Sequence, residues 1–104
     1  MTIDPGLLVP KIKTSIRISH KKLDEDIEDT ILAALKDLQV CGITAPPAED
    51  TDSLDPLILN AVKLYCKAEY ADDPAKSAEF QRRYDSMKSS LMMAEGYREV
   101  RSGE

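Results

Sequence analysis

Two aspartate-proline pairs, Asp55-Pro56 and Asp73-Pro74, fix the points at which two helices of this chain begin. An aspartate just before a helix accepts a hydrogen bond from a free backbone N–H of the first turn, and the proline that follows lacks only an N–H that would be unpaired anyway. A run of helical periodicity follows each pair, over residues 57–70 and 75–93. The sequence therefore predicts a helical hairpin whose turn lies at residues 71–73.

The first half of the chain carries two further helical segments. Asp4-Pro5 resembles a third helix start, but Pro10 would interrupt the hydrogen-bond ladder, so we expect a regular helix only at about residues 10–17. After a polar linker, an apolar stripe and the stop signal of Gly42 predict a helix over residues 23–41. Its stripe consists of Leu23, Ile27, Ile31, Ala34, Leu35 and Leu38.

The two helices of the hairpin differ in how much of their circumference is apolar. In the first of them only Asn60, Lys63 and Lys67 interrupt the apolar surface, which predicts the central helix of the domain. The second has one narrow stripe, so we expect it to lie on one side of the core and to end at Gly96. That stripe consists of Phe80, Tyr84, Met87 and Leu91.

Two segments, residues 43–54 and 97–104, lack periodicity. The first is acidic and longer than the usual helix connection, so we expect an exposed loop. Neither segment has enough apolar residues to offset an ordering cost of about 1 to 2 kcal/mol per residue. We therefore expect both to be mobile in an isolated subunit and ordered in an assembly. The expected organisation is one all-α domain of four helices, residues 1–96, with a long C-terminal hairpin and a flexible tail at 97–104.

Length and charge restrict the class of protein. A chain of 104 residues forms one domain and cannot also enclose a large substrate cavity. Its formal net charge of -5 argues against affinity gained by neutralising nucleic-acid phosphates. No apolar run approaches the roughly 20 residues that span a bilayer, and the first residues do not resemble a signal peptide, so we expect a soluble intracellular protein. Two cysteines are too few for a disulfide framework.

Few residues point to catalysis or to a cofactor. His20, Cys41 and Cys66 lack the spacing of zinc ligands. The carboxylates of residues 24–29 lack the pattern of a calcium loop and are favoured at a helix start by its partial positive charge. A single histidine offers no evident acid-base pair, and no Gly-rich phosphate loop is present. We expect no metal, no cofactor and no catalysis, with a small enzyme subunit as a remote alternative.

The order of several features along the chain is informative as a set. Ile16-Arg17-Ile18 precedes a polar linker, Leu23-Asp24-Glu25-Asp26-Ile27 opens a helix, and Cys41-Gly42 closes it. The hairpin follows with Asp55-Pro56, Ile58, Ala61, Val62 and Tyr65, and then Phe80, Tyr84, Lys88 and Leu91. Over about residues 10–91 this order resembles the head-tail connector proteins of tailed bacteriophages, also described as DNA packaging or head completion proteins. Residues 65–69 depart from the pattern, since they keep one aromatic where family members often have two.

The resemblance implies a structural subunit of the virion neck, present in the host bacterial cytoplasm before assembly. It implies a homo-oligomeric ring of about twelve subunits beneath the portal protein, which extends the DNA channel. Its other partner would be a downstream neck or tail completion protein. DNA would be loosely enclosed cargo, and no membrane would be bound. The residues by themselves support a soluble helical interaction module.

Some residues are candidates for subunit contacts. Leu32 and Val40 lie well off the apolar stripe of their helix, so they have no evident place in the core of a monomer. Further candidates are Leu57, Arg82, Arg83, Tyr97 and Arg98.

An alternative function is that of a helix-turn-helix regulator of DNA, which needs a basic recognition helix. The moderately basic stretch around Arg82-Arg83 is diluted by Glu79 and Asp85, so we expect no measurable binding of the free subunit to duplex DNA near physiological salt.

Overall fold

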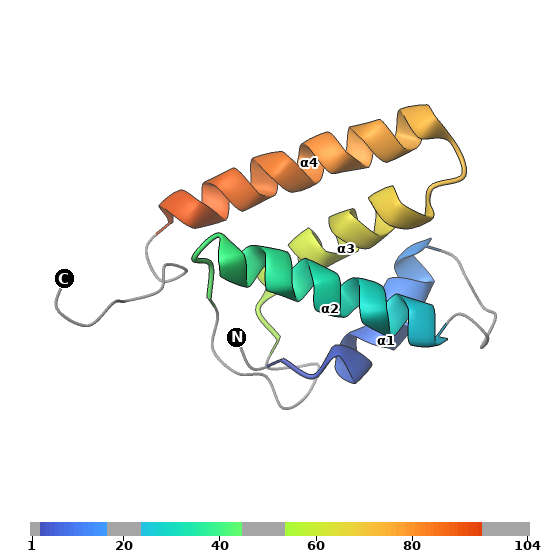
Figure 1. The fold of residues 1–104 in the computed structure, drawn as a ribbon, viewed down its shortest axis with the longest axis horizontal. Helices are drawn as coiled ribbons and strands as arrows, with labels where there is room; N and C mark the ends of the chain where they lie inside the picture. Colours follow the sequence, from blue (N-terminus) through green and yellow to red (C-terminus); the bar gives the residue numbers. More distant parts are fainter. Residues whose placement is uncertain (1–2, 17–23, 45–53, 95–104) are drawn as a thin grey trace, which may run out of the picture.

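The computed structural model describes residues 3–16, 24–44 and 54–94, which form four α-helices (Figure 1). They are α1 (Pro5–Ile16), α2 (Asp24–Val40), α3 (Pro56–Tyr70) and α4 (Pro74–Met93). No β-strand occurs in these three stretches. The predicted all-α class, with four helices and a C-terminal hairpin, is confirmed.

Aspartate caps set the start of three of the helices. The Asp55 carboxylate accepts hydrogen bonds from the backbone N–H groups of Leu57 (2.9 Å) and Ile58 (3.2 Å) at the start of α3. Asp73 accepts one from Ala75 at 2.8 Å at the start of α4. A proline occupies the next position in each case, as the sequence predicts.

The prediction for α1 was wrong, because the helix begins at Pro5 and continues through Pro10. Asp4 caps it, accepting a hydrogen bond from the N–H of Gly6 at 2.9 Å. The N–H that Pro10 lacks would have bonded to the carbonyl of Gly6, four residues earlier. Both residues are exposed, so water can satisfy that carbonyl and the interruption costs less than it would in the core.

The C-terminus of α2 explains a second departure from prediction. Gly42 has a φ of +81°. Its N–H donates a hydrogen bond to the carbonyl of Gln39 at 3.0 Å, and the N–H of Ile43 donates one to the carbonyl of Leu38, also at 3.0 Å. This is a Schellman motif, in which the second residue after the cap packs on the last turn of the helix. Ile43 is accordingly buried, and so is Leu54 at the other end of the connection. The expected exposed loop over 43–54 was wrong at both ends, and residues 45–53 lie outside the described part.

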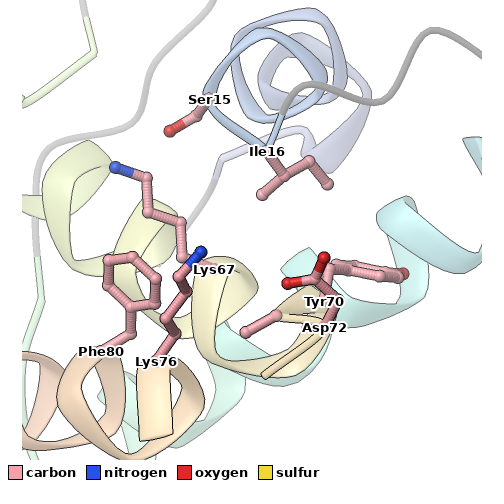
Figure 2. Close-up of a pocket in the computed structure, with 8 residues that line it drawn as sticks. Ser15, Ile16, Lys67, Tyr70, Asp72, Lys76 and Phe80 are labelled. Carbon is pink, nitrogen blue, oxygen red and sulfur yellow. The ribbon is translucent and has the colours of Figure 1, made fainter. Parts of the chain in front are cut away.

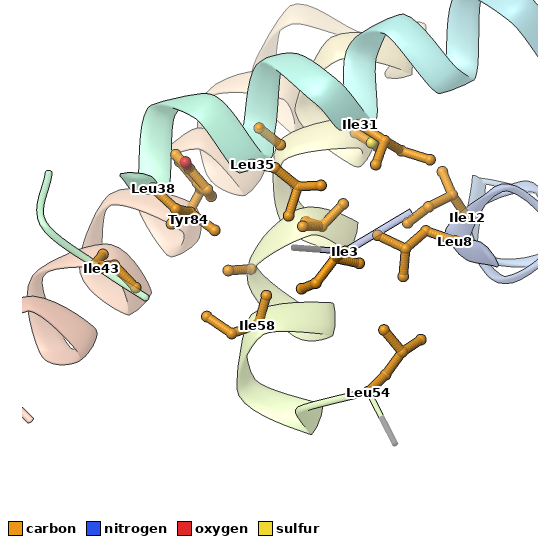
Figure 3. Packing of buried hydrophobic residues seen from close by; sticks show 14 of the residues in the cluster. Ile3, Leu8, Ile12, Ile31, Leu35, Leu38, Ile43, Leu54, Ile58 and Tyr84 are labelled. Carbon is orange, nitrogen blue, oxygen red and sulfur yellow. The ribbon is translucent and has the colours of Figure 1, made fainter. Parts of the chain in front are cut away.

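The core lies between α1, α2 and α3, and α4 packs along α3 (Figures 1 and 3). Helix α3 contacts the other three helices, which confirms its predicted central position. The expected stripe of α2 is buried from Ile27 to Leu38, while Leu23 lies outside the described residues. The largest of the fully buried side chains are Leu8, Ile12, Ile27, Ile31, Leu38, Ile43, Ile58, Val62, Cys66, Tyr84 and Leu91.

Helix α4 buries only Tyr84 and Leu91, and the other two residues of its predicted stripe are half-buried. It ends at Met93 with Ala94 as C-cap, before the expected stop at Gly96. Gly96 and the predicted tail, residues 97–104, lie outside the described part of the chain. The division into a domain of residues 1–96 and a flexible tail stays a prediction.

Candidate functional site

Helix α2 has two opposite faces, and the one turned away from the core carries two of the predicted contact residues. At 100° per residue, its exposed residues fall on the side opposite the buried stripe. Leu32 is 48% exposed and Val40 is 72% exposed, so both lie off the core as predicted. We call this surface the outer face of α2; it consists of Glu25, Asp26, Glu28, Asp29, Leu32, Ala33, Lys36, Gln39 and Val40.

Of the other predicted contact residues, the three that the structure describes lie on α3 and α4. Leu57 is 44% exposed at the start of α3. Arg82 and Arg83 are exposed on α4, where both pair with Glu79, at 2.6 and 3.1 Å. Tyr97 and Arg98 lie outside the described residues. The contact role of all seven predicted residues stays a prediction.

A cleft of about 570 Å³, which the sequence did not predict, lies where the end of α1 meets the turn of the α3–α4 hairpin (Figure 2). Phe80 and Ile16 supply apolar surface, and the Nζ of Lys67 lies 5.6 Å from the centre of the Phe80 ring. The lining residues are Ser15, Ile16, Lys67, Tyr70, Ala71, Asp72, Lys76 and Phe80. The cleft can therefore accept a partner that offers both apolar and anionic groups.

Two hydrogen bonds fix the walls of this cleft. Ser77 donates to the carbonyl of Ala68 at 2.7 Å, which joins the first turn of α4 to the last turns of α3. Thr30 donates its hydroxyl proton to the carbonyl of Asp26 at 2.8 Å, so the Tyr70 hydroxyl is the donor in its 3.1 Å bond with Thr30. The ring of Tyr70 is thus held between the cleft and α2.

A second, smaller hollow of about 340 Å³ lies between α1 and α3 and is lined by Pro10, Lys11, Thr14 and Lys63. Lys63 and Lys67 are one turn apart on α3, so the hollow and the cleft lie along the same side of that helix. We call the two together the basic groove. No ion pair joins Lys11, Lys63, Lys67 or Lys76 to another described residue.

Charge is divided unevenly among the helices. Helix α2 carries six acidic residues and one lysine, a net charge of -5. Helices α1, α3 and α4 together carry eight basic and three acidic residues, a net charge of +5. The overall negative charge of the chain therefore conceals one acidic helix and three helices that are basic in sum.

A polar cluster connects α2 with α4. The carboxylate of Asp37 accepts a hydrogen bond from the Tyr84 hydroxyl at 2.6 Å and another from the Nζ of Lys88 at 3.1 Å. Tyr65 supports the cluster through an edge contact with the Tyr84 ring, at 5.2 Å between ring centres. This arrangement fixes α4 on α2 through a single carboxylate.

The ionisation of these groups follows from their surroundings. Burial raises the pKa of Asp37, but the hydrogen bonds from Tyr84 and Lys88 and the charge of Lys88 outweigh it, so the pKa lies below its ordinary value of 3.8. Burial and the bond to Asp37 raise the pKa of Tyr84. Burial lowers the pKa of Lys88, but Asp37 outweighs it, and the net change is upward. At neutral pH each group keeps its ordinary charge, which suits a structural contact.

The two cysteines differ in burial. Cys66 is buried in the core, and burial followed by the charge of Glu69 raises the pKa of its thiol to about 12. Cys41 is a free, half-buried thiol. Within the described stretches, no three His, Cys, Asp or Glu residues are grouped so as to hold a metal ion. None of the described helices is both long and apolar enough to cross a membrane.

These features define a small helical protein with exposed helix faces of opposite charge. A family model described as phage connector protein matches residues 8–98, which include most of α1 and the whole of α2, α3 and α4. The chain belongs to this family, as its sequence pattern predicts, and it is a structural protein of the phage connector type. No curated protein and no solved structure matches the chain.

Proposed function

We propose that the chain is the subunit of a ring that lies beneath the portal in the neck of a tailed phage or prophage particle. The ring extends the DNA channel and presents a docking surface for the next neck or tail component. The family match over residues 8–98 carries this proposal, because it includes most of α1 and the whole of the other three helices. The role is structural, so the subunit catalyses no reaction.

Exposed apolar side chains support an assembly role. Leu32, Val40 and Leu57 are joined by two methionines that the sequence did not single out, Met92 (43% exposed) and Met93 (82% exposed). Single exposed apolar residues are ordinary, but a ring subunit buries such side chains against its neighbours.

The experiment that tests the proposal is deletion of the gene from the phage or prophage. We expect heads that package DNA but carry no tail, and a plasmid copy of the gene should restore tailed particles. Cryo-electron microscopy of restored particles should show a ring of this chain beneath the portal. Normal tailed particles without the gene would exclude the proposal.

The alternative, a helix-turn-helix regulator, has less support. Its most basic stretch lies on α4, where Arg82 and Arg83 both pair with Glu79. We expect no measurable binding of duplex DNA in a fluorescence-anisotropy titration at about 150 mM salt. Sub-micromolar, sequence-dependent binding would favour the regulator, since specific affinities are typically about 10 nM or tighter.

A further inference from the structure

The basic groove has the chemistry of a binding surface. In the cleft, Phe80 and Ile16 lie beside Lys67 and Lys76, and the smaller hollow adds two further lysines, Lys11 and Lys63. The lining of the two hollows contains one acidic residue, Asp72. An occupant that fits this groove presents carboxylates beside an apolar side chain.

The outer face of α2 has the complementary chemistry. Leu32 is nearly half exposed and lies one turn beyond Glu28 and Asp29 on the same side of the helix. Neither carboxylate forms an ion pair with another described residue. Carboxylates one turn from a half-exposed leucine match lysines beside a half-buried phenylalanine.

One chain cannot satisfy both surfaces by itself. No residue of α2 lines the basic groove, and the outer face of α2 points away from the core that α1 and α3 share with it. The two surfaces are different, so contact between copies is head-to-tail, and such contacts form a closed ring when the rotation between neighbours closes.

We propose that the outer face of α2 in one subunit binds the basic groove of the next, with Leu32 against Phe80 and Ile16, and Glu28 and Asp29 against Lys67 and Lys76. The proposal rests on the proposed function, since it assigns the subunit contact of the ring. The outer face of α2 carries four carboxylates and one lysine, whereas the basic groove is lined by four lysines and one carboxylate, and this opposition gives the contact its direction.

Charge reversal tests the pairing. One variant carries Lys67→Glu with Lys76→Glu, and the other carries Glu28→Lys with Asp29→Lys. In each variant like charges meet across the contact, so self-association measured by sedimentation velocity should weaken at least about tenfold. An equal mixture of the two variants should associate again, because every contact in an alternating assembly then joins opposite charges.

Two controls separate specific pairing from net charge. Ser86→Glu with Ser90→Glu, and separately Asp85→Lys, make changes of the same sign on the exposed side of α4, outside both surfaces and outside the predicted contact residues, and should assemble as the unmodified chain does. Leu32→Glu should leave helicity and melting nearly unchanged while weakening assembly. A large loss of melting temperature in Leu32→Glu would place Leu32 in the core and overturn the inference.

The outcomes distinguish this inference from the proposed function. If the unmodified chain forms the ring but the two charge-reversed variants assemble equally well, or their mixture is not restored, the contact is elsewhere and the ring proposal stands. If the chain assembles only on the portal, the same comparison is made by measuring how much of each variant, and of their mixture, is incorporated into particles. If the unmodified chain is monomeric and absent from the neck, both proposals are wrong.

Discussion

Helices α3 and α4 form one hairpin but are held in place by different interactions. The fifteen residues of α3 include five that are buried, all apolar, and the helix contacts every other helix. The twenty residues of α4 include only two that are buried, and its attachment to α2 depends on Tyr84, Lys88 and Asp37. Burial in α3 is non-directional and insensitive to pH, whereas the contacts of α4 are directional and titratable. The domain thus has a hydrophobic centre and one helix whose contact with α2 depends on a few polar groups.

The largest loss of stability should follow a substitution in the hydrophobic centre, on α3. Ile58 is 1% exposed on α3, and Ile58→Ala should lower the free energy of unfolding by about 2 to 5 kcal/mol, because it removes buried apolar area and leaves a cavity. Urea denaturation measures the change. Leu57→Ala is the matched control, one residue away and 44% exposed, and should cost about 0.5 kcal/mol or little more. Equal losses for the two variants would contradict the burial described for α3.

The next largest effect should come from the contact between α2 and α4. Tyr84→Phe removes the hydroxyl that donates a hydrogen bond to Asp37 and should lower the free energy of unfolding by about 1.5 kcal/mol. This value is at the low end for hydrogen bonds to charged groups, because the Asp37 side chain remains partly exposed to water. The same substitution in an Asp37→Asn background should cost less, since its charged partner is already absent. Urea denaturation of all four chains completes a double-mutant cycle. Additive losses would show that the two residues are not coupled.

A smaller effect should follow loss of the cap of α4. Asp73→Ala removes the acceptor for the N–H of Ala75 and should cost about 1 kcal/mol. Asp72→Ala, in the same turn, is the control, since it removes a carboxylate of equal charge without removing the cap. Thermal unfolding followed by circular dichroism compares the two variants. A larger loss for Asp72→Ala would assign the stabilisation to the turn rather than to the cap.

The smallest effect should be the acid sensitivity of Asp37. Its pKa is lower in the folded protein than the ordinary value of 3.8, so its stabilising contribution is present above that value and is lost as pH falls through the folded pKa. The stability difference between the unmodified chain and Asp37→Asn should therefore be constant near neutral pH and shrink below about pH 4. Urea denaturation at several pH values measures it. A stability difference that grows on acidification would mean that the fold disfavours the charged form of Asp37.

Local signals in the sequence predicted the helices well. A cap depends on residues adjacent in the chain, so Asp55-Pro56 and Asp73-Pro74 located two helix starts without knowledge of the tertiary structure. The start of α1 was missed because the cost of Pro10 depends on whether the carbonyl of Gly6 faces water, which the sequence does not state. Ile43 was recoverable, since a glycine stop followed by an apolar residue is the pattern of the Schellman motif.

The candidate surfaces were only partly predictable. Leu32 and Val40 could be found because their exposure follows from the periodicity of one helix. The basic groove could not, since Ile16, Lys67 and Phe80 come from three helices and meet only after folding. Periodicity describes one helix at a time, and a cleft between helices depends on how they cross.

The division of charge between α2 and the other helices has a consequence for the speed of assembly. Opposite charges on different sides of a molecule give it an electric dipole, and two dipoles in water rotate each other toward a head-to-tail orientation before their surfaces touch. Encounters that begin in this orientation succeed more often, which raises the association rate. The effect fades over a screening length of about 8 Å at physiological salt, so added salt should slow the joining of subunits more than it speeds their separation.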